Sequence, residues 1–153
     1  MSGPAEKLSF AVSRGDGDTI DSAWEEIWAG ADGDAVARKE RGSMLRSLPL
    51  MLLHELLVAP GHHVHQQVAM EIQQRADPSS LSVVARVLDG GFQSLTYTCS
   101  DDKTIAKWFG HILARIGTPE AVAMVSHYAR SDNPGIAAEM QYRLERIHQQ
   151  VAR

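Results

Sequence analysis

Four histidines gather in the stretch HELLVAPGHHVH, at His54, His62, His63 and His65. Imidazole nitrogens bind zinc and other transition metals, so this cluster is the first candidate for chemistry. A zinc-protease pattern needs a second histidine four residues after the first, and Val58 stands there instead. The last three histidines straddle a turn, which favours a solvated helix start. Metal binding by these three stays an open alternative, although no carboxylate is obviously placed to complete the site.

An acidic run at Asp16, Asp18 and Asp21 resembles a fragment of a calcium-binding loop. It lacks the third ligand position, the glycine and the closing glutamate that such a loop requires. We therefore expect no calcium site here.

The stretch DGGFQSLTYTCSDD, residues 89–102, contains the single cysteine, Cys99, followed by Asp101 and Asp102. No basic residue stands beside Cys99 to lower the pKa of its thiol, which argues against a nucleophile. The two carboxylates could serve acid and base chemistry, but they lie where a helix begins, and there a carboxylate accepts hydrogen bonds from exposed N–H groups. The chain also lacks a nucleophile elbow and a phosphate-binding glycine loop. We predict no catalytic residue, no cofactor and no enzymatic activity.

Two aromatic residues in the same stretch, Phe92 and Tyr97, follow no helical period. They either fold back onto the core or face a partner, and the sequence leaves both open. Trp108 lies next to an apolar stripe and is expected to be partly exposed. The aromatic residues expected in the core, because they fall on apolar stripes, are Trp24, Trp28 and Phe109.

Composition limits the classes of function. The 153 residues are 44% hydrophobic and 22% charged, with a net charge of −4, as in an ordinary globular domain. Dispersed lysines and arginines exclude the basic footprint of a nucleic-acid-binding protein. No apolar run is long enough to span a membrane, and MSGPAEKLSF lacks the apolar core of a secretory signal. We expect a cytoplasmic protein without a nucleic-acid or membrane partner; its oligomeric state stays open, with a monomer in a one-to-one complex favoured.

Internal repetition reveals the elements that position these residues. TIAKWFGHILARIG (104–117) aligns with GIAAEMQYRLERIH (135–148) at an offset of 31, and both carry one apolar helical stripe. A third copy lies upstream at an offset of 41, where Val64, Val68 and Ile72 continue the stripe. The next helix also repeats, because 77–88 aligns with 118–129. Pro78 and Pro119 coincide at the first helical position, which tolerates proline.

The two offsets differ by ten residues, so the first repeat carries an insertion of about that length at 90–99. Before the repeats, 19–30 predicts a capping helix that stops at Gly30, 34–45 a polar helix and 47–61 a strongly apolar helix that should be the most buried. Residues 1–17 are expected to be a flexible lead. We predict an all-α protein of about seven helices without a sheet. Its single domain covers 18–153, with capping helices over 18–60, repeats over 61–149 and the insertion within 89–102.

Residues 116–147 resemble a HEAT or HEAT-like repeat, with a Thr-Pro-Glu turn, an Asp-Asn-Pro turn and a terminal Leu-x-Arg-Ile. The resemblance implies a right-handed α-solenoid of stacked antiparallel helix pairs. Residues 91–147 also resemble small bacterial HEAT-type proteins found beside polymorphic toxins, which implies an immunity protein that binds and neutralises a cognate toxin. Contact residues would come from one layer of helices and from the insertion: Ser82, Arg86, Met124, His127, Phe92, Tyr97, Asp101, Asp102 and Trp108.

The alternative is a HEAT-like scaffold or enzyme accessory unrelated to toxins, such as a regulatory subunit or a ligand-binding protein similar to bilin lyases. HEAT-like DNA glycosylases use a strongly basic groove, which a net charge of −4 does not supply. A protein-binding module is therefore the favoured function.

Overall fold

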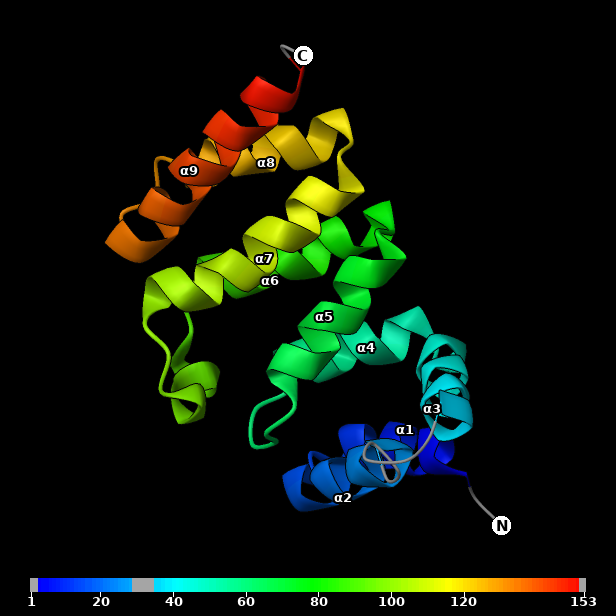
Figure 1. Ribbon diagram of the computed structural model, residues 1–153. Coiled ribbons are helices and arrows are strands. Elements are labelled where there is room, and N and C mark those ends of the chain that lie inside the picture. Colours follow the sequence, from blue (N-terminus) through cyan, green and yellow to red (C-terminus); the bar gives the residue numbers. More distant parts are fainter. Residues whose placement is uncertain (1–2, 29–34, 152–153) are drawn as a thin grey trace. The chain divides into compact units, whose positions relative to one another are not determined.

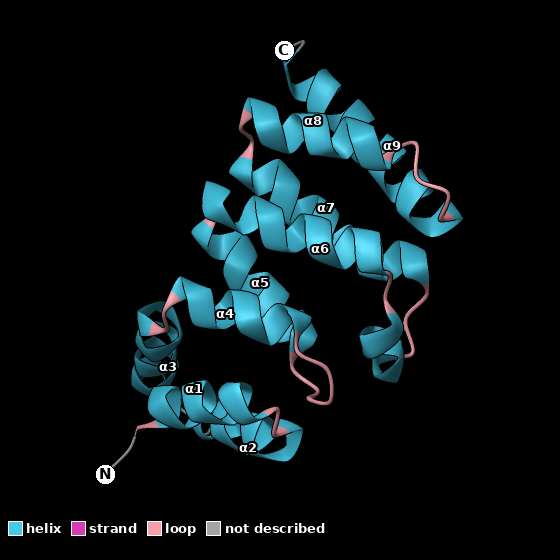
Figure 2. Cartoon of the chain, turned by 180° about the vertical axis from the view of Figure 1, so that it is seen from behind, coloured by secondary structure: helices cyan, strands magenta, loops and turns pink. Residues whose placement is uncertain are grey.

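The computed structural model describes residues 3–28 and 35–151, and all regular structure in these ranges is helical (Figure 1). Short connections join the helices, and no strand occurs in the described residues (Figure 2). The all-α prediction is confirmed. The α-helices are α1 (Pro4–Arg14), α2 (Gly17–Trp28), α3 (Ala35–Ser47), α4 (Leu50–Val58), α5 (His65–Arg75), α6 (Leu81–Gly90), α7 (Asp102–Ile116), α8 (Pro119–Tyr128) and α9 (Pro134–Val151). Two short 3-10 helices, η1 (Pro78–Ser80) and η2 (Gln93–Thr98), accompany them.

The chain forms two compact units, Met1–Glu71 and Ile72–Arg153. The boundary lies inside α5, a continuous helix. The composition does not change at this position, and the single domain over 18–153 stays a prediction.

In the first unit, the expected flexible lead over 1–17 contains α1 instead. Pro4 occupies the first turn, and Gly15 ends the helix in the left-handed conformation that glycine adopts readily. Leu8 and Ala11 are fully buried, and α1 packs against α2. A helix of 11 residues gains its stability from such packing, so its own sequence carries too short an apolar stripe to predict it.

The predicted capping helix is α2, which buries Ile20, Trp24 and Ile27 on one face. Asp16, a candidate calcium ligand by type, instead accepts a hydrogen bond of 3.1 Å from the backbone N–H of Thr19 at the helix start. Gly30, the predicted stop, and the side chain of Trp28 lie outside the described residues.

The apolar helix of 47–61 is α4, which begins after Pro49 and ends before Pro60, as predicted. Its apolar residues are not all buried, although the sequence is apolar nearly all round. Leu52, Leu53, Leu56 and Leu57 are buried, but the side chain of Met51 is 74% exposed. Helix α4 is therefore one-sided, like any helix at the edge of a core.

In the second unit, α6, α7, α8 and α9 occupy the predicted repeat positions. Asp77 caps η1 and Thr118 caps α8, each by accepting a hydrogen bond from a backbone N–H in the following turn. Helix α7 packs against α6, α8 and α9, and α8 packs against α6 and α9. Each repeat helix therefore contacts both its neighbour in sequence and the next but one.

An ion pair is buried where α7 meets α9. The Arg143 guanidinium donates to Glu139 across one helical turn at 3.0 Å, and both residues are at most 9% exposed. A Cβ at Gly110 of α7 would lie 3.4 Å from the Glu139 carboxylate. The lack of a side chain at this glycine lets α9 bring the pair close to the α7 backbone.

Candidate functional site

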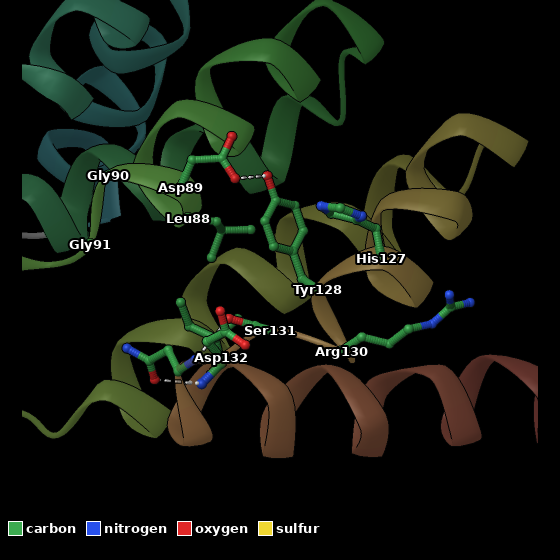
Figure 3. Close-up of a pocket in the computed structure, with 11 residues that line it drawn as sticks. Leu88, Asp89, Gly90, Gly91, His127, Tyr128, Arg130, Ser131 and Asp132 are labelled. Atoms are coloured by element: carbon green, nitrogen blue, oxygen red, sulfur yellow. Dashed lines mark hydrogen bonds between the residues drawn. The ribbon is translucent and has the colours of Figure 1, made fainter.

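An open hollow of about 680 Å³ lies in the second unit where α6, α8 and the α8–α9 turn meet (Figure 3). Three segments line it: the end of α6, the end of α8 with its turn, and the start of α9. The lining residues are Leu88, Asp89, Gly90, Gly91, His127, Tyr128, Arg130, Ser131, Asp132, Asn133 and Ile136.

A hydrogen bond between Tyr128 and Asp89 connects the ends of α8 and α6, two of the segments that line the hollow. The buried Tyr128 hydroxyl donates to an Asp89 carboxylate oxygen at 2.8 Å, as the dashed line in Figure 3 shows. Burial and the hydrogen bond to Asp89 raise the pKa of Tyr128 well above its usual range. The hydroxyl therefore remains a protonated donor and orients the Asp89 carboxylate at the end of α6.

Asn133, in the third segment that lines the hollow, accepts hydrogen bonds from exposed backbone N–H groups at the start of α9. Its side-chain oxygen accepts from the backbone N–H of Gly135 at 2.9 Å and of Ile136 at 3.1 Å. Its amide nitrogen donates to Asp102 at the start of α7, also at 2.9 Å. A Cβ at Gly135 would meet the backbone nitrogen of Lys103 at 2.7 Å, so α9 and α7 touch directly here. The turn that borders the hollow is therefore anchored to two helices.

Over this anchored base, His127, Arg130 and Asp132 are exposed polar side chains. The His127 ring packs edge-on against Tyr128, with ring centroids 4.8 Å apart. In Figure 3, Arg130 extends away from the hydrogen-bonded pair of Asp89 and Tyr128. The hollow thus presents both signs of charge, with donors and acceptors on separate elements, which suits recognition of a polar surface.

The helix residues predicted to contact a partner are distributed unevenly around this hollow. His127 lines it, as an exposed residue at the end of α8. Ser82 and Arg86 are exposed on α6 and Met124 is half-buried on α8, but none of the three lines the hollow. Only one member of this predicted set therefore belongs to the site.

The insertion is folded as the 3-10 helix η2, not as an open loop. Phe92 is only 6% exposed and its ring stacks on Phe109 of α7, with centroids 6.0 Å apart. A buried ring cannot anchor a partner without unfolding, so the assignment of Phe92 as a contact residue is corrected: it belongs to the core. Tyr97 is half-buried in η2, and Leu95 beside it is buried.

Of the two aspartates that close the insertion, Asp101 caps α7 and Asp102 is the first residue of that helix. Asp101 accepts from the backbone N–H of Thr104 at 2.8 Å, as predicted. Hydrogen bonds from the side chain and from the backbone of Thr104 lower the pKa of Asp101. Asp102 is exposed and borders the site through Asn133. Cys99 is exposed in a left-handed conformation at the end of η2. Trp108 is half-buried on α7, as the sequence predicted.

The histidine cluster belongs to the first unit and is engaged by its own backbone. His62 and His65 are buried, with ring nitrogens 2.7 Å from the carbonyl oxygens of Leu56 and Ala59. The His63 ring forms a hydrogen bond of 2.7 Å with the Asp21 carboxylate. Within residues 3–28 and 35–151, no three histidine, cysteine or acidic side chains are placed to bind one metal ion.

Sequence reasoning missed Asp89, Arg130 and Asp132. The sequence pattern places Asp89 at the start of the aperiodic stretch 89–102 and Asp132 in the turn SDNPG, and neither position indicates a binding role. The available signal was the repeat register, which aligns the ends of α6 and α8, the two helix ends that the Tyr128–Asp89 hydrogen bond joins.

Comparisons with family models, with curated proteins and with solved structures find no match for this chain. In the part of the chain that the structure describes, every helix is too short or too polar to cross a membrane.

Proposed function

We propose that the protein is a non-catalytic protein-binding module, most specifically an immunity protein that binds and neutralises a cognate bacterial toxin in the cytoplasm as a monomer. The scaffold in this proposal is a right-handed HEAT-like α-solenoid. It is supported by the second unit, where α6 packs on α8 and α7 on α9 while consecutive helices also pack together. Two layers of helices related in this way are typical of stacked repeats.

The hollow beside Tyr128 carries the binding proposal. Its base is anchored by the Tyr128–Asp89 and Asn133–Asp102 hydrogen bonds, while His127 and Arg130 are exposed. A polar surface that is already ordered loses little entropy when it binds, which favours tight recognition. The resemblance of residues 91–147 to toxin-associated HEAT-type proteins supplies the class of partner.

Co-expression with a toxin domain encoded beside this chain tests the proposal. We expect growth to be restored and the two chains to purify as a one-to-one complex. Failure of both would refute the immunity function. Stable binding to a metabolic enzyme, without protection from a toxin, would instead support the scaffold or accessory function.

Paired variants then test the surface. Asp89→Ala with Arg130→Ala removes exposed charge on two walls of the hollow and should weaken the complex by about 2 kcal/mol or more, about 30-fold in Kd. The matched control is Glu120→Ala with Arg146→Ala, which removes one exposed charge of each sign from α8 and α9 outside the hollow. Equal effects of the two pairs would show that the hollow is not the interface.

A further inference from the structure

The connection between α4 and α5, residues 59–64, is held closely against α2 in the first unit. A Cβ at Gly17 would overlap the carbonyl oxygen of Gly61, so the two backbones touch. Asp21 of α2 accepts two hydrogen bonds of 2.7 Å from His63, one from its backbone N–H and one from its ring. Gly61 has a φ of 91°, which permits the bend. The connection is therefore an ordered element with specific contacts.

A missing backbone donor explains why a histidine is buried here. The carbonyl oxygen of Leu56 lies in the last turn of α4, where its helical partner would be the N–H of residue 60. That residue is Pro60, which has no N–H. The His62 ring nitrogen Nε2 takes its place and donates to Leu56 at 2.7 Å.

A second hydrogen bond fixes the protonation state of His62. Its other ring nitrogen, Nδ1, accepts from the backbone N–H of Val64 at 3.2 Å. A nitrogen that accepts carries no proton, so the ring is neutral in this arrangement. His65 likewise donates from Nε2 to the Ala59 carbonyl at 2.7 Å. The two rings stack with centroids 3.8 Å apart, and each residue is 1% exposed.

We propose that His62 and His65 form an acid-sensitive latch, which holds the α4–α5 connection folded against the end of α4 at neutral pH and releases it when both rings gain a proton. A proton on Nδ1 of His62 would replace the acceptor for Val64 with a second donor. A charge on His65 would lie at the first turn of α5, where the helix dipole disfavours a cation. Two charged rings in contact would also repel each other inside the core.

The neighbouring groups determine the direction of the titration. Burial lowers the pKa of both rings, and for His65 to about 4. The pKa of His65 is also lowered by a charge on His62, and a charge on His63 lowers both pKa values slightly. The Leu56 carbonyl raises the pKa of His62, the Ala59 carbonyl raises that of His65, and the Asp21 carboxylate of α2 raises both. Desolvation outweighs the raising effects. The latch is therefore complete above pH 6.5, the ordinary histidine value, and is lost progressively as the pH falls towards 4.

The test follows ring titration and amide hydrogen exchange in the full chain between pH 7.5 and 4.5. We expect the protection factors of the Val64 and His63 amides to fall about tenfold or more between pH 7 and 5. The double variant His62→Gln, His65→Gln supplies amide donors that do not titrate, so its protection should change much less. His148→Gln, an exposed histidine on α9, is the control and should behave as the parent.

Unchanged protection in the parent, or an equal loss in the double variant, would overturn the latch. If the double variant does not fold, the parent's own ring titration decides. A His65 midpoint at or above 6.5 would mean that the ring gains its proton without opposing the folded state, and the proposal would fail.

Discussion

Replacing Phe92 by alanine tests the most consequential correction made by the structure, the transfer of this residue from a binding surface to the core. Phe92 is 6% exposed, so nearly the whole ring leaves water on folding. Burial of such a side chain stabilises the fold by about 1.5–3 kcal/mol, and the stack with Phe109 adds about 0.5–1.5 kcal/mol. The resulting cavity adds a further cost. We expect a loss of about 3–4 kcal/mol in the free energy of unfolding.

Urea denaturation of the full chain, monitored by circular dichroism, measures this loss. With a slope of about 2 kcal/mol/M, the midpoint should fall by about 1.5–2 M. Phe10→Ala is the matched control, since Phe10 is 63% exposed on α1. The Arg14 guanidinium lies 5.2 Å from the centroid of the Phe10 ring, and an exposed contact of this kind contributes at most about 1 kcal/mol.

Partner affinity separates the two roles of Phe92. A core residue lowers stability while the remaining folded protein binds its partner normally. Unchanged stability of Phe92→Ala together with loss of the complex would refute the core assignment and return the insertion to the interface.

Three further substitutions test the local physics. Tyr128→Phe removes the hydrogen bond to the Asp89 carboxylate on α6 and should lower the free energy of unfolding by about 1 kcal/mol in urea denaturation. Asp89 is exposed, so water can replace the lost donor, and a loss above about 3 kcal/mol would contradict this reasoning. Glu139→Gln leaves the Arg143 charge buried without its counterion and should cost about 3 kcal/mol by the same measurement, whereas an unchanged midpoint would refute the ion pair. Gly17→Ala places a methyl group against the Gly61 carbonyl and should cost about 1–3 kcal/mol in thermal unfolding.

Matched controls isolate each effect. Glu145→Gln makes the same chemical change as Glu139→Gln at an exposed position on the same helix, and should be neutral within about 0.5 kcal/mol. Gly90→Ala is the control for Gly17→Ala, because no atom lies within 4 Å of a Cβ there. Helix propensity favours alanine over glycine at both positions, so equal destabilisation by Gly17→Ala and Gly90→Ala would show that the contact with Gly61 does not set the cost.

The helices of the second unit were predictable because their signals are local. Asp77 and Thr118 each mark the start of a helix, because each side chain accepts from a backbone N–H at most three residues further along the chain. The apolar residues of α7 and of α9 recur with the same helical spacing. Helix α1 was missed because its two buried residues, Leu8 and Ala11, make too short a stripe to be recognised without the surface of α2.

The candidate site was less predictable because its bonds join distant residues. Tyr128 meets Asp89 across 39 positions, and Asn133 meets Asp102 across 31. The repeat register showed which helix ends lie together, but it could not show which side chains point into the shared space. Phe92 illustrates the limit, because its position in an aperiodic stretch was compatible with either a core or a surface role.

The sequence by itself determined the helical class and the helix starts of the second unit, because caps and apolar periods act within a few residues. The tertiary structure alone decided that Phe92 is buried and that His62 replaces the donor missing at Pro60. Burial and hydrogen bonding between separate elements depend on how helices pack, and helices with the same stripe can present different residues to the core.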